Sequence, residues 1–350
     1  MHSLTKWRSK HEDTGYILQK NAELTKVTLA TLRARRAHTL FKWVEGHSGH
    51  PGNEAADVLA GIGAEKDAPD EIRLDVDGAF TISGAKLAAM TQKLAYRAIR
   101  NRKATTIEQR PRAVANINRI VEEFRTAFDI HLRDEAVWMS LTSRNISREC
   151  RQFMWMTIHD GYMVGSHWLR PKMSEELQAR AECKICGGTE SMHHILFECR
   201  ATGREVIWGL LKQTWALTGR PWKEPSWGTA LGAACVVLKS DSDARLHAAE
   251  QLWTILWTES LYLIWKLRCE RVIGRDGQQL TEREVTNRWY ATIDQRLTLD
   301  RRTAALAVGK RALNPSIVES VWTPILDVKE ELPDGWVVKS GVLVGIKRGR

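Results

Sequence analysis

Two short stretches of this sequence hold residues whose types and spacing could carry out chemistry. The first, "FKWVEGHSGHPGNEAAD" (residues 41–57), places His47 in a glycine-flanked loop, followed by Glu54 and, one helical turn later, Asp57. Carboxylates that hold a divalent cation, together with a mobile imidazole, suit metal-assisted hydrolysis at phosphate. A loop rich in Gly and His between a strand and a helix is also a common plain turn, so the spacing alone leaves both interpretations open.

The second stretch, "CKICGGTESMHHILFEC" (residues 183–199), has the spacing of a metal-ligand set. Cys183, Cys186, His194 and Cys199 form the pattern C-x2-C-x7-H-x4-C, which offers three thiolates and one imidazole to a tetrahedral Zn²⁺. Four protein ligands close the coordination sphere, which indicates a structural rather than a catalytic metal. His193 is an alternative to His194, and a group of free thiols is the alternative to a metal site.

The first stretch must be positioned by a helix, a strand and a second helix. Residues 21–37 show the periodicity of an amphipathic helix, with Asn21 as its cap. The bulky stretch 38–44 predicts a strand that runs into the Gly46 turn, and a helix is expected from Asn53, with Asn53 as its cap. An acidic, proline-containing segment then predicts a linker over residues 66–84.

The stretch "WVEGHSGHPGNEAADVLA" closely resembles the closing motif of type 1 ribonuclease H domains. The resemblance implies that residues 1–65 are the C-terminal half of such a domain. It implies catalytic roles for Asp57, as the last magnesium-binding carboxylate, and for the loop residue His47. Glu54, one turn before Asp57 on the same helix face, is a further candidate catalytic residue from its spacing. It also implies contact with nucleic acid by a set of polar and basic residues: Lys6, Lys10, Arg33, Arg35, Arg36 and Asn53.

This resemblance stops short of a complete active site. The family uses four carboxylates to hold two Mg²⁺ or Mn²⁺ ions, and three of the four have no match in this chain. The acids that precede Asp57 lie on segments that do not match the family's positions: Glu12, Asp13, Glu23 and Glu45. We therefore expect a truncated ribonuclease H that is inactive alone; a gene model that lacks its 5′ exon is the alternative.

A single strand exposes both its edges, so residues 1–65 are expected to be marginally stable by themselves. We expect them to dock on the helical part of the chain or on a partner, either the missing ribonuclease H half or another polyprotein component.

The Cys/His stretch also carries a resemblance. Its residues "CKICGGTES" and "HILFEC" look like the zinc-binding module that follows reverse transcriptase and ribonuclease H regions in non-LTR retrotransposon polyproteins. The order of the two motifs in one chain implies a retroelement source.

Most of the remaining sequence predicts helices. The expected fold is mixed α/β but mostly helical, with a partial ribonuclease H-like unit (strand plus helices), a zinc knuckle and a helical C-terminal region. Helical periodicity makes the tryptophans of the longest predicted helix, Trp253, Trp257 and Trp265, core residues rather than a base-stacking platform. The predicted ranges are 1–65 (ribonuclease H half), 66–84 (linker), 85–180 (helical), 181–205 (zinc knuckle), 206–335 (helical) and 336–350 (basic tail or hairpin).

The composition suits a partner that is a polyanion. The net charge is +10, and two arginine-rich clusters stand out, Arg33–Arg36 and Arg97–Arg112. They predict contact with an RNA/DNA hybrid or with single strands, unless they are a solubilising surface. No stretch approaches the roughly 18 apolar residues of a membrane span, and no signal peptide is recognisable. We expect an intracellular protein, in the nucleus or cytoplasm, with Cys150, Cys235 and Cys269 as free thiols.

Three functions are therefore open at the level of sequence. The first is a retroelement-derived ribonuclease H-type protein that binds nucleic acid, whose ancestral reaction is hydrolysis of the RNA strand of RNA/DNA hybrids. The second is a zinc-knuckle nucleic-acid-binding module without catalysis. The third is a helical protein-interaction module in which zinc, as Zn²⁺, is purely structural.

Overall fold

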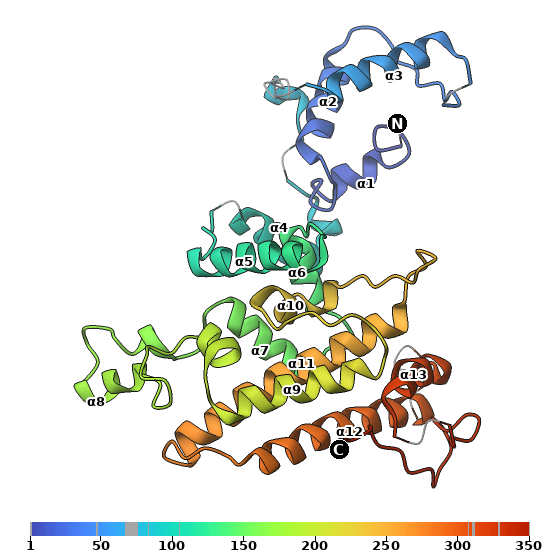
Figure 1. The fold of residues 1–350 in the computed structure, drawn as a ribbon. Coiled ribbons are helices and arrows are strands. Elements are labelled where there is room, and N and C mark those ends of the chain that lie inside the picture. Colours follow the sequence, from blue (N-terminus) through green and yellow to red (C-terminus); the bar gives the residue numbers. More distant parts are fainter. Residues whose placement is uncertain are drawn as a thin grey trace. The chain divides into compact units, whose positions relative to one another are not determined.

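The computed structural model divides the chain into two compact units, Met1–Glu108 (unit 1) and Gln109–Arg350 (unit 2) (Figure 1). It describes residues 2–46, 48–66, 76–82, 84–104, 106–306, 308–309, 312–327 and 330–349. The division falls inside the range 85–180 that the sequence treats as one helical region. Each unit is described by itself below.

Unit 1 consists of short helices joined by irregular segments: α1 (Arg8–Asp13), α2 (Ala22–Ala34), α3 (Pro51–Ala64), α4 (Gln92–Ala104) and the 3₁₀ turns η1 (Gly78–Phe80) and η2 (Leu87–Ala89). Two polar contacts attach the segment around α4 to the N-terminal helices. Lys86 forms an ion pair with Asp13 at 2.6 Å, and the Asn101 side chain donates to the Ile17 carbonyl at 3.5 Å. These bonds explain why α4 belongs to unit 1 rather than to the helices that follow it.

The predicted strand at residues 38–44 is wrong, whereas the mostly helical character of the predicted fold is confirmed. Residues 37–45 have no regular secondary structure, and the described parts of the chain contain only three isolated β-bridges besides helices and turns. A β-strand is stabilised by hydrogen bonds to a neighbouring strand. No described segment of unit 1 offers one, so this β-favouring sequence stays unpaired.

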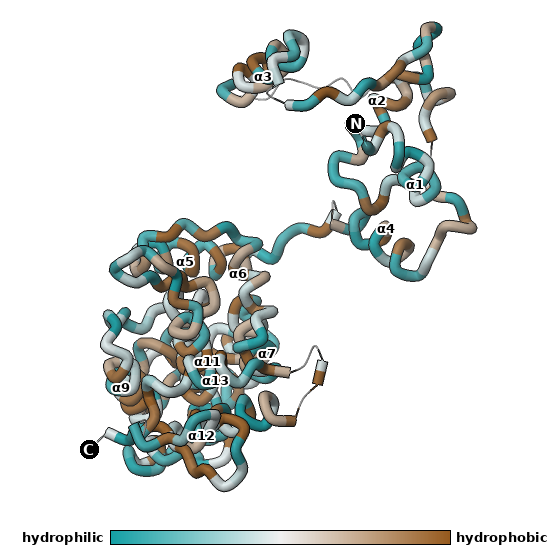
Figure 2. Tube along the Cα trace, turned by 90° about the vertical axis from the view of Figure 1, so that its right-hand side faces the viewer, coloured by the Kyte–Doolittle hydropathy of each residue, from teal (hydrophilic) through white to brown (hydrophobic). Residues whose placement is uncertain are grey.

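Helix α3 carries the second half of the first motif and is almost fully exposed. It begins with Pro51 in its first turn and His50 as its N-cap, which corrects the predicted cap at Asn53. It buries no residue, and its apolar side chains Val58, Leu59 and Ile62 are 63%, 69% and 55% exposed. Figure 2 shows hydrophobic stretches, in brown, on the α3 tube. Apolar side chains that stay exposed contribute little to the stability of unit 1, and the marginal stability of residues 1–65 stays a prediction.

Unit 2 is a helical bundle with two short π-helical segments. Its α-helices are α5 (Pro111–Phe128), α6 (Asp134–Ser140), α7 (Arg148–Ile158), α8 (Glu175–Gln178), α9 (Thr202–Ala216), α10 (Trp227–Leu231), α11 (His247–Cys269), α12 (Glu282–Leu306) and α13 (Pro315–Trp322). The π-helical segments are η5 (His194–Glu198) and η7 (Glu270–Gly274), and the 3₁₀ turns are η3 (Gly165–His167), η4 (Ala179–Ala181), η6 (Ala233–Cys235) and η9 (Thr323–Ile325).

Helix α11 is the centre of this bundle. It packs against α7, α9, α10, α12 and α13, and Figure 1 shows it running alongside α9. Trp253 and Trp257 stack at 4.5 Å between ring centroids and are almost completely buried, as the sequence predicts. None of the described helices has the length and apolarity needed to cross a bilayer.

Of the two forms predicted for the C-terminal segment, a basic tail or a hairpin, the hairpin is not found in the described residues 335–349. The one described bridge of this segment joins Leu326 and Ile346, and no strand is assigned there. The guanidinium of Arg301 on α12 donates hydrogen bonds to the carbonyl oxygens of Trp336, Val337 and Val342, at 2.9 to 3.3 Å. The backbone of this segment is therefore hydrogen-bonded to α12 rather than to a second strand.

Candidate metal centre and nucleic-acid segment

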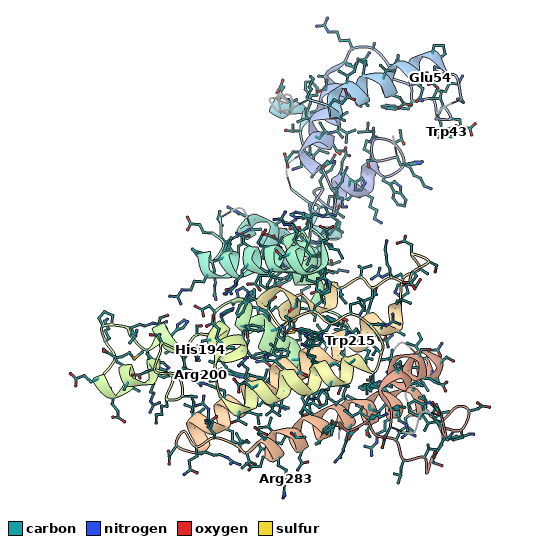
Figure 3. The ribbon with its side chains drawn as sticks, viewed as in Figure 1. Trp43, Glu54, His194, Arg200, Trp215 and Arg283 are labelled. Atoms are coloured by element: carbon teal, nitrogen blue, oxygen red, sulfur yellow. The ribbon has the colours of Figure 1, made fainter. Side chains whose placement is uncertain are left out.

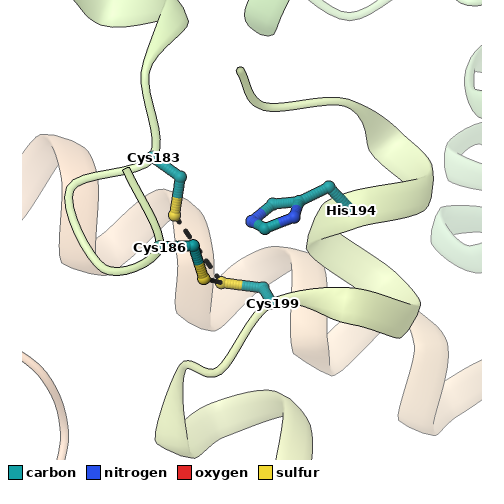
Figure 4. A group of neighbouring side chains, drawn as sticks. All are labelled: Cys183, Cys186, His194 and Cys199. Atoms are coloured by element: carbon teal, nitrogen blue, oxygen red, sulfur yellow. Dashed lines mark hydrogen bonds between the residues drawn. The ribbon is translucent and has the colours of Figure 1, made fainter. Parts of the chain in front are cut away.

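The four predicted metal ligands converge in unit 2. Figure 4 shows the His194 ring pointing toward the three sulfurs of Cys183, Cys186 and Cys199. One ligand atom from each side chain lies within 4.8 Å of all the others. The Sγ atom of Cys199 is 3.7 Å from that of Cys183 and 3.9 Å from that of Cys186. Sulfurs that bind one tetrahedral zinc at about 2.3 Å are separated by about 3.8 Å, so the spacing fits this ion.

Local backbone turns place the first two cysteines. The Cys183 N–H donates to the Gly188 carbonyl at 2.8 Å, and the Gly187 N–H donates to the Cys183 carbonyl at 2.8 Å. Gly187 has a φ of +75°, a conformation that glycine adopts without steric cost. The tight turn therefore follows from the sequence Cys-Gly-Gly and brings Cys186 back beside Cys183.

The other two ligands come from one π-helical turn. His194 begins η5, and Cys199 ends it, with the Cys199 N–H donating to the His194 carbonyl at 2.7 Å. The wider turn places ligands five residues apart on one side. Trp208 of α9 holds this turn in place, because its indole N–H donates to the Leu196 carbonyl at 2.8 Å.

The structure distinguishes His194 from His193. The Nε2 atom of His194 is buried and has no hydrogen-bond partner, as expected for a ring nitrogen that binds a metal ion. His193 instead contacts Glu198 at 3.1 Å and the guanidinium of Arg119. A buried polar atom without a partner is costly, so the orphaned nitrogen favours zinc at this position.

The pKa values of two of these thiols are shifted in opposite directions. Burial raises the pKa of Cys199 to about 12, with the neighbouring Cys183 adding to the effect. Burial also acts on Cys186, but hydrogen bonds from Arg200 and from the other thiols outweigh it and lower the pKa of Cys186. A zinc ion would bind all three sulfurs as thiolates and leave no open coordination position, so the centre suits structure rather than catalysis.

The predicted catalytic residues of unit 1 are less organised. Glu54 and Asp57 lie on α3, and both are exposed. Glu54 accepts a hydrogen bond from the Gly49 N–H at 3.3 Å, and the Asn53 side chain donates to Asp57 at 3.4 Å. His47 lies outside the described residues. Figure 3 labels Glu54 together with Trp43, whose side chain is 67% exposed.

These residues do not fit a two-metal site by themselves. Among the described residues, the Cys183 cluster is the only group of three or more His, Cys, Asp or Glu side chains arranged to hold a metal. Asp57 and Glu54 are therefore without a third described metal-binding side chain, whereas Mg²⁺ sites draw carboxylates from several elements. No reaction step through magnesium follows from this geometry.

The basic residues of unit 1 fall into two groups. The ammonium groups of Lys6 and Lys10 lie 5.5 and 5.2 Å from the ring centroid of Trp7, which is itself partly exposed. Arg35 and Arg36 are exposed, directly after α2. Arg33 differs because it forms an ion pair with Glu12 and donates a hydrogen bond to the Phe80 carbonyl at 3.3 Å. Its positive charge is therefore neutralised within unit 1.

Comparison with known proteins bears on the first of these segments. The family model for RNase H matches residues 1–65. Residues 1–65 are thus similar to RNase H domains. Ribonuclease H of Zymomonas mobilis is 42% identical over 65 residues, which are 17% of this chain and 40% of that protein. Ribonuclease H of Alcanivorax borkumensis is 33% identical over 69 residues, and that of Brucella ovis is 51% identical over 47.

The match to the RNase H relatives is partial in both directions. The alignment covers 19% of this chain and 46% of the Alcanivorax borkumensis protein, and 13% and 29% for Brucella ovis. The chain therefore spans less than half the length of these relatives. No solved structure matches this chain.

The sequence interpretation missed one feature of unit 2. Trp265, predicted to be core, is only partly buried, and together with Arg268 and Arg271 it lines a large cavity. The available signal was the change from apolar residues to "KLRCERVIGR" at the end of the longest helix.

Proposed function

We propose that this chain is a retroelement-derived, ribonuclease H-type nucleic-acid-binding protein. The observation that carries the proposal is the RNase H match of residues 1–65. The ancestral reaction would be metal-dependent hydrolysis of the RNA strand of RNA/DNA hybrids, with residues 1–65 as the C-terminal half of the domain. The Cys/His centre, in the order seen in retrotransposon polyproteins, supports the retroelement source.

Contact with nucleic acid would be made by the exposed basic residues of unit 1. Lys6 and Lys10 lie beside the partly exposed Trp7, a combination that suits a phosphate backbone and an unstacked base or sugar. Arg35 and Arg36 would add phosphate contacts. Arg33 would contribute less to phosphate binding than Arg35 and Arg36, because Glu12 neutralises its charge.

We propose that the chain does not cleave hybrids unaided. Glu54 and Asp57 stand on one exposed helix, without a group of further described carboxylates around them. The missing ribonuclease H half, or another polyprotein component, would then be the partner of unit 1. The exposed apolar residues of α3, Val58, Leu59 and Ile62, would be the surface against which that partner packs.

Zinc is proposed to stabilise unit 2 rather than to react. When bound, the ion would hold Cys183, Cys186, His194 and Cys199 together and so join the η5 turn to the turn before it. Thiolate ligands require a reducing compartment, in line with an intracellular location.

Cleavage of a labelled RNA/DNA hybrid tests this function. Three proteins are compared with Mg²⁺ or Mn²⁺: the native chain, its Asp57→Asn variant, and a fusion that supplies upstream the part of the Zymomonas mobilis enzyme not covered by the match. We expect cleavage from the fusion alone and loss of that cleavage in its Asp57→Asn form. Cleavage by the native chain that depends on Asp57 would contradict the proposed inactivity, and hybrid binding no stronger than that of a neutral protein would contradict the proposed contact.

A further inference from the structure

A cavity of about 740 Å³ opens in unit 2, apart from the four ligating side chains. Its walls come from the loop after α7, from α8 with η4, and from the end of α11 with η7. Figure 1 shows α8 and the C-terminal end of α11 on the same side of unit 2. The volume is within the roughly 300–1,000 Å³ of small-molecule sites.

Arg271 gives this cavity an unneutralised positive charge. It is only 4% exposed and it lines the cavity. Within the described part of the chain its guanidinium forms no hydrogen bond and no ion pair, and none of its nitrogens is sealed from solvent. A buried guanidinium without a partner is unfavourable, and a phosphate or carboxylate would satisfy it with charge-assisted hydrogen bonds.

The neighbouring arginine is different. Arg268 also lines the cavity, but its guanidinium forms an ion pair with Glu190, which is 3% exposed. The same guanidinium lies 5.5 Å from the ring centroid of Trp265. Because Arg268 is neutralised and stacked, Arg271 and the lining residue Lys184 are cations left to receive an anion, and of these Arg271 is the buried one.

The backbone that carries Arg271 is held in a π-helical turn. Glu270, the first residue of η7, accepts hydrogen bonds from Arg275 at 2.9 Å and from Arg288 at 3.1 Å. The Gly277 N–H donates to the Arg271 carbonyl at 2.8 Å. Single π-helical turns are rare and often occur at functional sites, because the extra residue redirects a side chain. Arg271 is thus positioned by contacts that do not use its own charge.

Aromatic rings form a second wall. Trp265 and Tyr162 lie 4.5 Å apart between ring centroids, and Trp168 carries the guanidinium of Arg180 at 5.6 Å from its own centroid. All three rings line the cavity and are only partly buried. A flat, aromatic part of a ligand gains favourable contact with such rings.

We propose that this cavity binds a nucleoside phosphate, with its phosphate on Arg271 and its base against the aromatic wall. Three carboxylates, Glu176, Glu182 and Asp276, also line the cavity. They disfavour a run of several phosphates, and they can accept hydrogen bonds from exocyclic amines of a base. The same chemistry is offered by a free nucleotide and by the terminal nucleotide of a single strand. The inference is independent of the ribonuclease H match, since it concerns only unit 2.

Calorimetric titration of the full chain tests this proposal with four probes: AMP, adenosine, inorganic phosphate and a 5′-phosphorylated ten-nucleotide single strand. We expect AMP to bind at least tenfold more tightly than adenosine or phosphate. A strand that binds more tightly than AMP would assign the site to a strand end, and equal affinities would assign it to the free nucleotide. Failure of both AMP and the strand to bind at millimolar concentration would overturn the proposal, as would phosphate binding as tightly as AMP.

Variants separate binding from folding. Arg271→Met should weaken AMP binding at least tenfold while leaving the melting temperature of the ligand-free protein unchanged or higher, because an unpaired buried charge is removed. The matched control is Arg283→Met, an exposed arginine of α12 labelled in Figure 3, which should change neither quantity. Trp168→Leu, at a partly exposed ring, should weaken AMP binding about tenfold and leave phosphate binding unchanged. AMP binding that survives in both Arg271→Met and Trp168→Leu would refute the site.

Discussion

Residues 41–57 and residues 183–199 are the two regions of this protein that suggest chemistry, and the structure treats them oppositely. The first has a family match, yet its carboxylates stand on an exposed helix that buries no residue. The second lies outside the residues of that match, yet its four ligating atoms lie within 4.8 Å of one another. Similarity to a known family therefore does not by itself mean that the candidate site residues lie close together in the structure.

The physical reason lies in how far apart the ligands are in the chain. The zinc ligands span 17 residues, from Cys183 to Cys199, so two local turns suffice to bring them together. A two-metal site collects carboxylates from several strands and helices, and each must be fixed by a sheet. Unit 1 has no strand in its described residues, so nothing there fixes such a set.

The largest expected effect comes from removing the metal centre. Cys199→Ser should abolish stoichiometric zinc and destabilise unit 2 by several kcal/mol, because binding energy at a closed site is folding energy. Zinc content and a thermal melt followed by near-ultraviolet circular dichroism measure this, with an expected fall of about 10 °C or more. Cys235→Ser is the control, since Cys235 is a free thiol outside the cluster. Equal melts for both variants would show that the cluster is a chance grouping of thiols.

The next effect concerns the charges buried in unit 2. Arg296 contacts Glu259 at 3.5 Å and Asp300 at 3.1 Å, and all three side chains are largely buried. Arg296→Met leaves two buried carboxylates uncompensated and should cost about 3–5 kcal/mol of unfolding free energy, measured by urea denaturation. Arg288→Met removes a partly exposed partner of Glu270 and should cost less than about 1 kcal/mol. Similar losses of unfolding free energy in Arg296→Met and Arg288→Met would contradict the expected difference between the buried and the exposed ion pair.

A pair of leucines compares the two units directly. Leu211 of α9 is completely buried, so Leu211→Ala should cost about 2–5 kcal/mol. Leu59 of α3 is 69% exposed, so Leu59→Ala should change stability by less than about 0.5 kcal/mol. Urea denaturation of the full chain measures both. A large loss of unfolding free energy from Leu59→Ala would mean that the apolar face of α3 is covered in solution, and would indicate that a partner segment packs on this face.

The smallest effect is a dependence on pH. Burial raises the pKa of Glu123, but hydrogen bonds from Arg119 at 2.6 Å and from the Gly228 N–H at 2.9 Å outweigh it and lower that pKa. A carboxyl whose pKa is lower in the folded state contributes stability above its unfolded pKa and loses it as the pH falls through the folded value.

Glu123→Gln should therefore reduce stability at pH 7 by less than about 1 kcal/mol and flatten its decline below about pH 4.5. Denaturation curves between pH 7 and pH 3 measure this, with Glu122→Gln, at an exposed neighbouring carboxylate, as the matched control. A decline that Glu123→Gln leaves unchanged would place the acid-sensitive groups elsewhere.

Much of the helical content could be predicted from the sequence. The apolar periodicity of residues 244–273 predicts a buried helix, and α11 with η7 fills that range apart from its first residues. The helix at residues 21–37 is also found, as α2, although the Asn21 side chain makes no capping hydrogen bond. Its backbone is left-handed there, and such detail depends on the neighbouring loop rather than on residue type.

Two predictions failed for tertiary reasons. The strand at 38–44 has β-favouring residues but no described partner strand, and the C-terminal segment is hydrogen-bonded to Arg301 of α12 rather than to a second strand. Strand propensity describes how a residue fits a sheet, and it has no effect where no sheet exists.

The sequence by itself determined the features that depend on residues close together in the chain: the RNase H motif, the Cys/His spacing and the amphipathic helices. Only the tertiary structure decided which histidine faces the three thiols, whether the motif carboxylates meet others, and that Trp265 and Arg271 share a cavity wall. These outcomes depend on contacts between distant segments, and such contacts are fixed by packing rather than by local residue pattern.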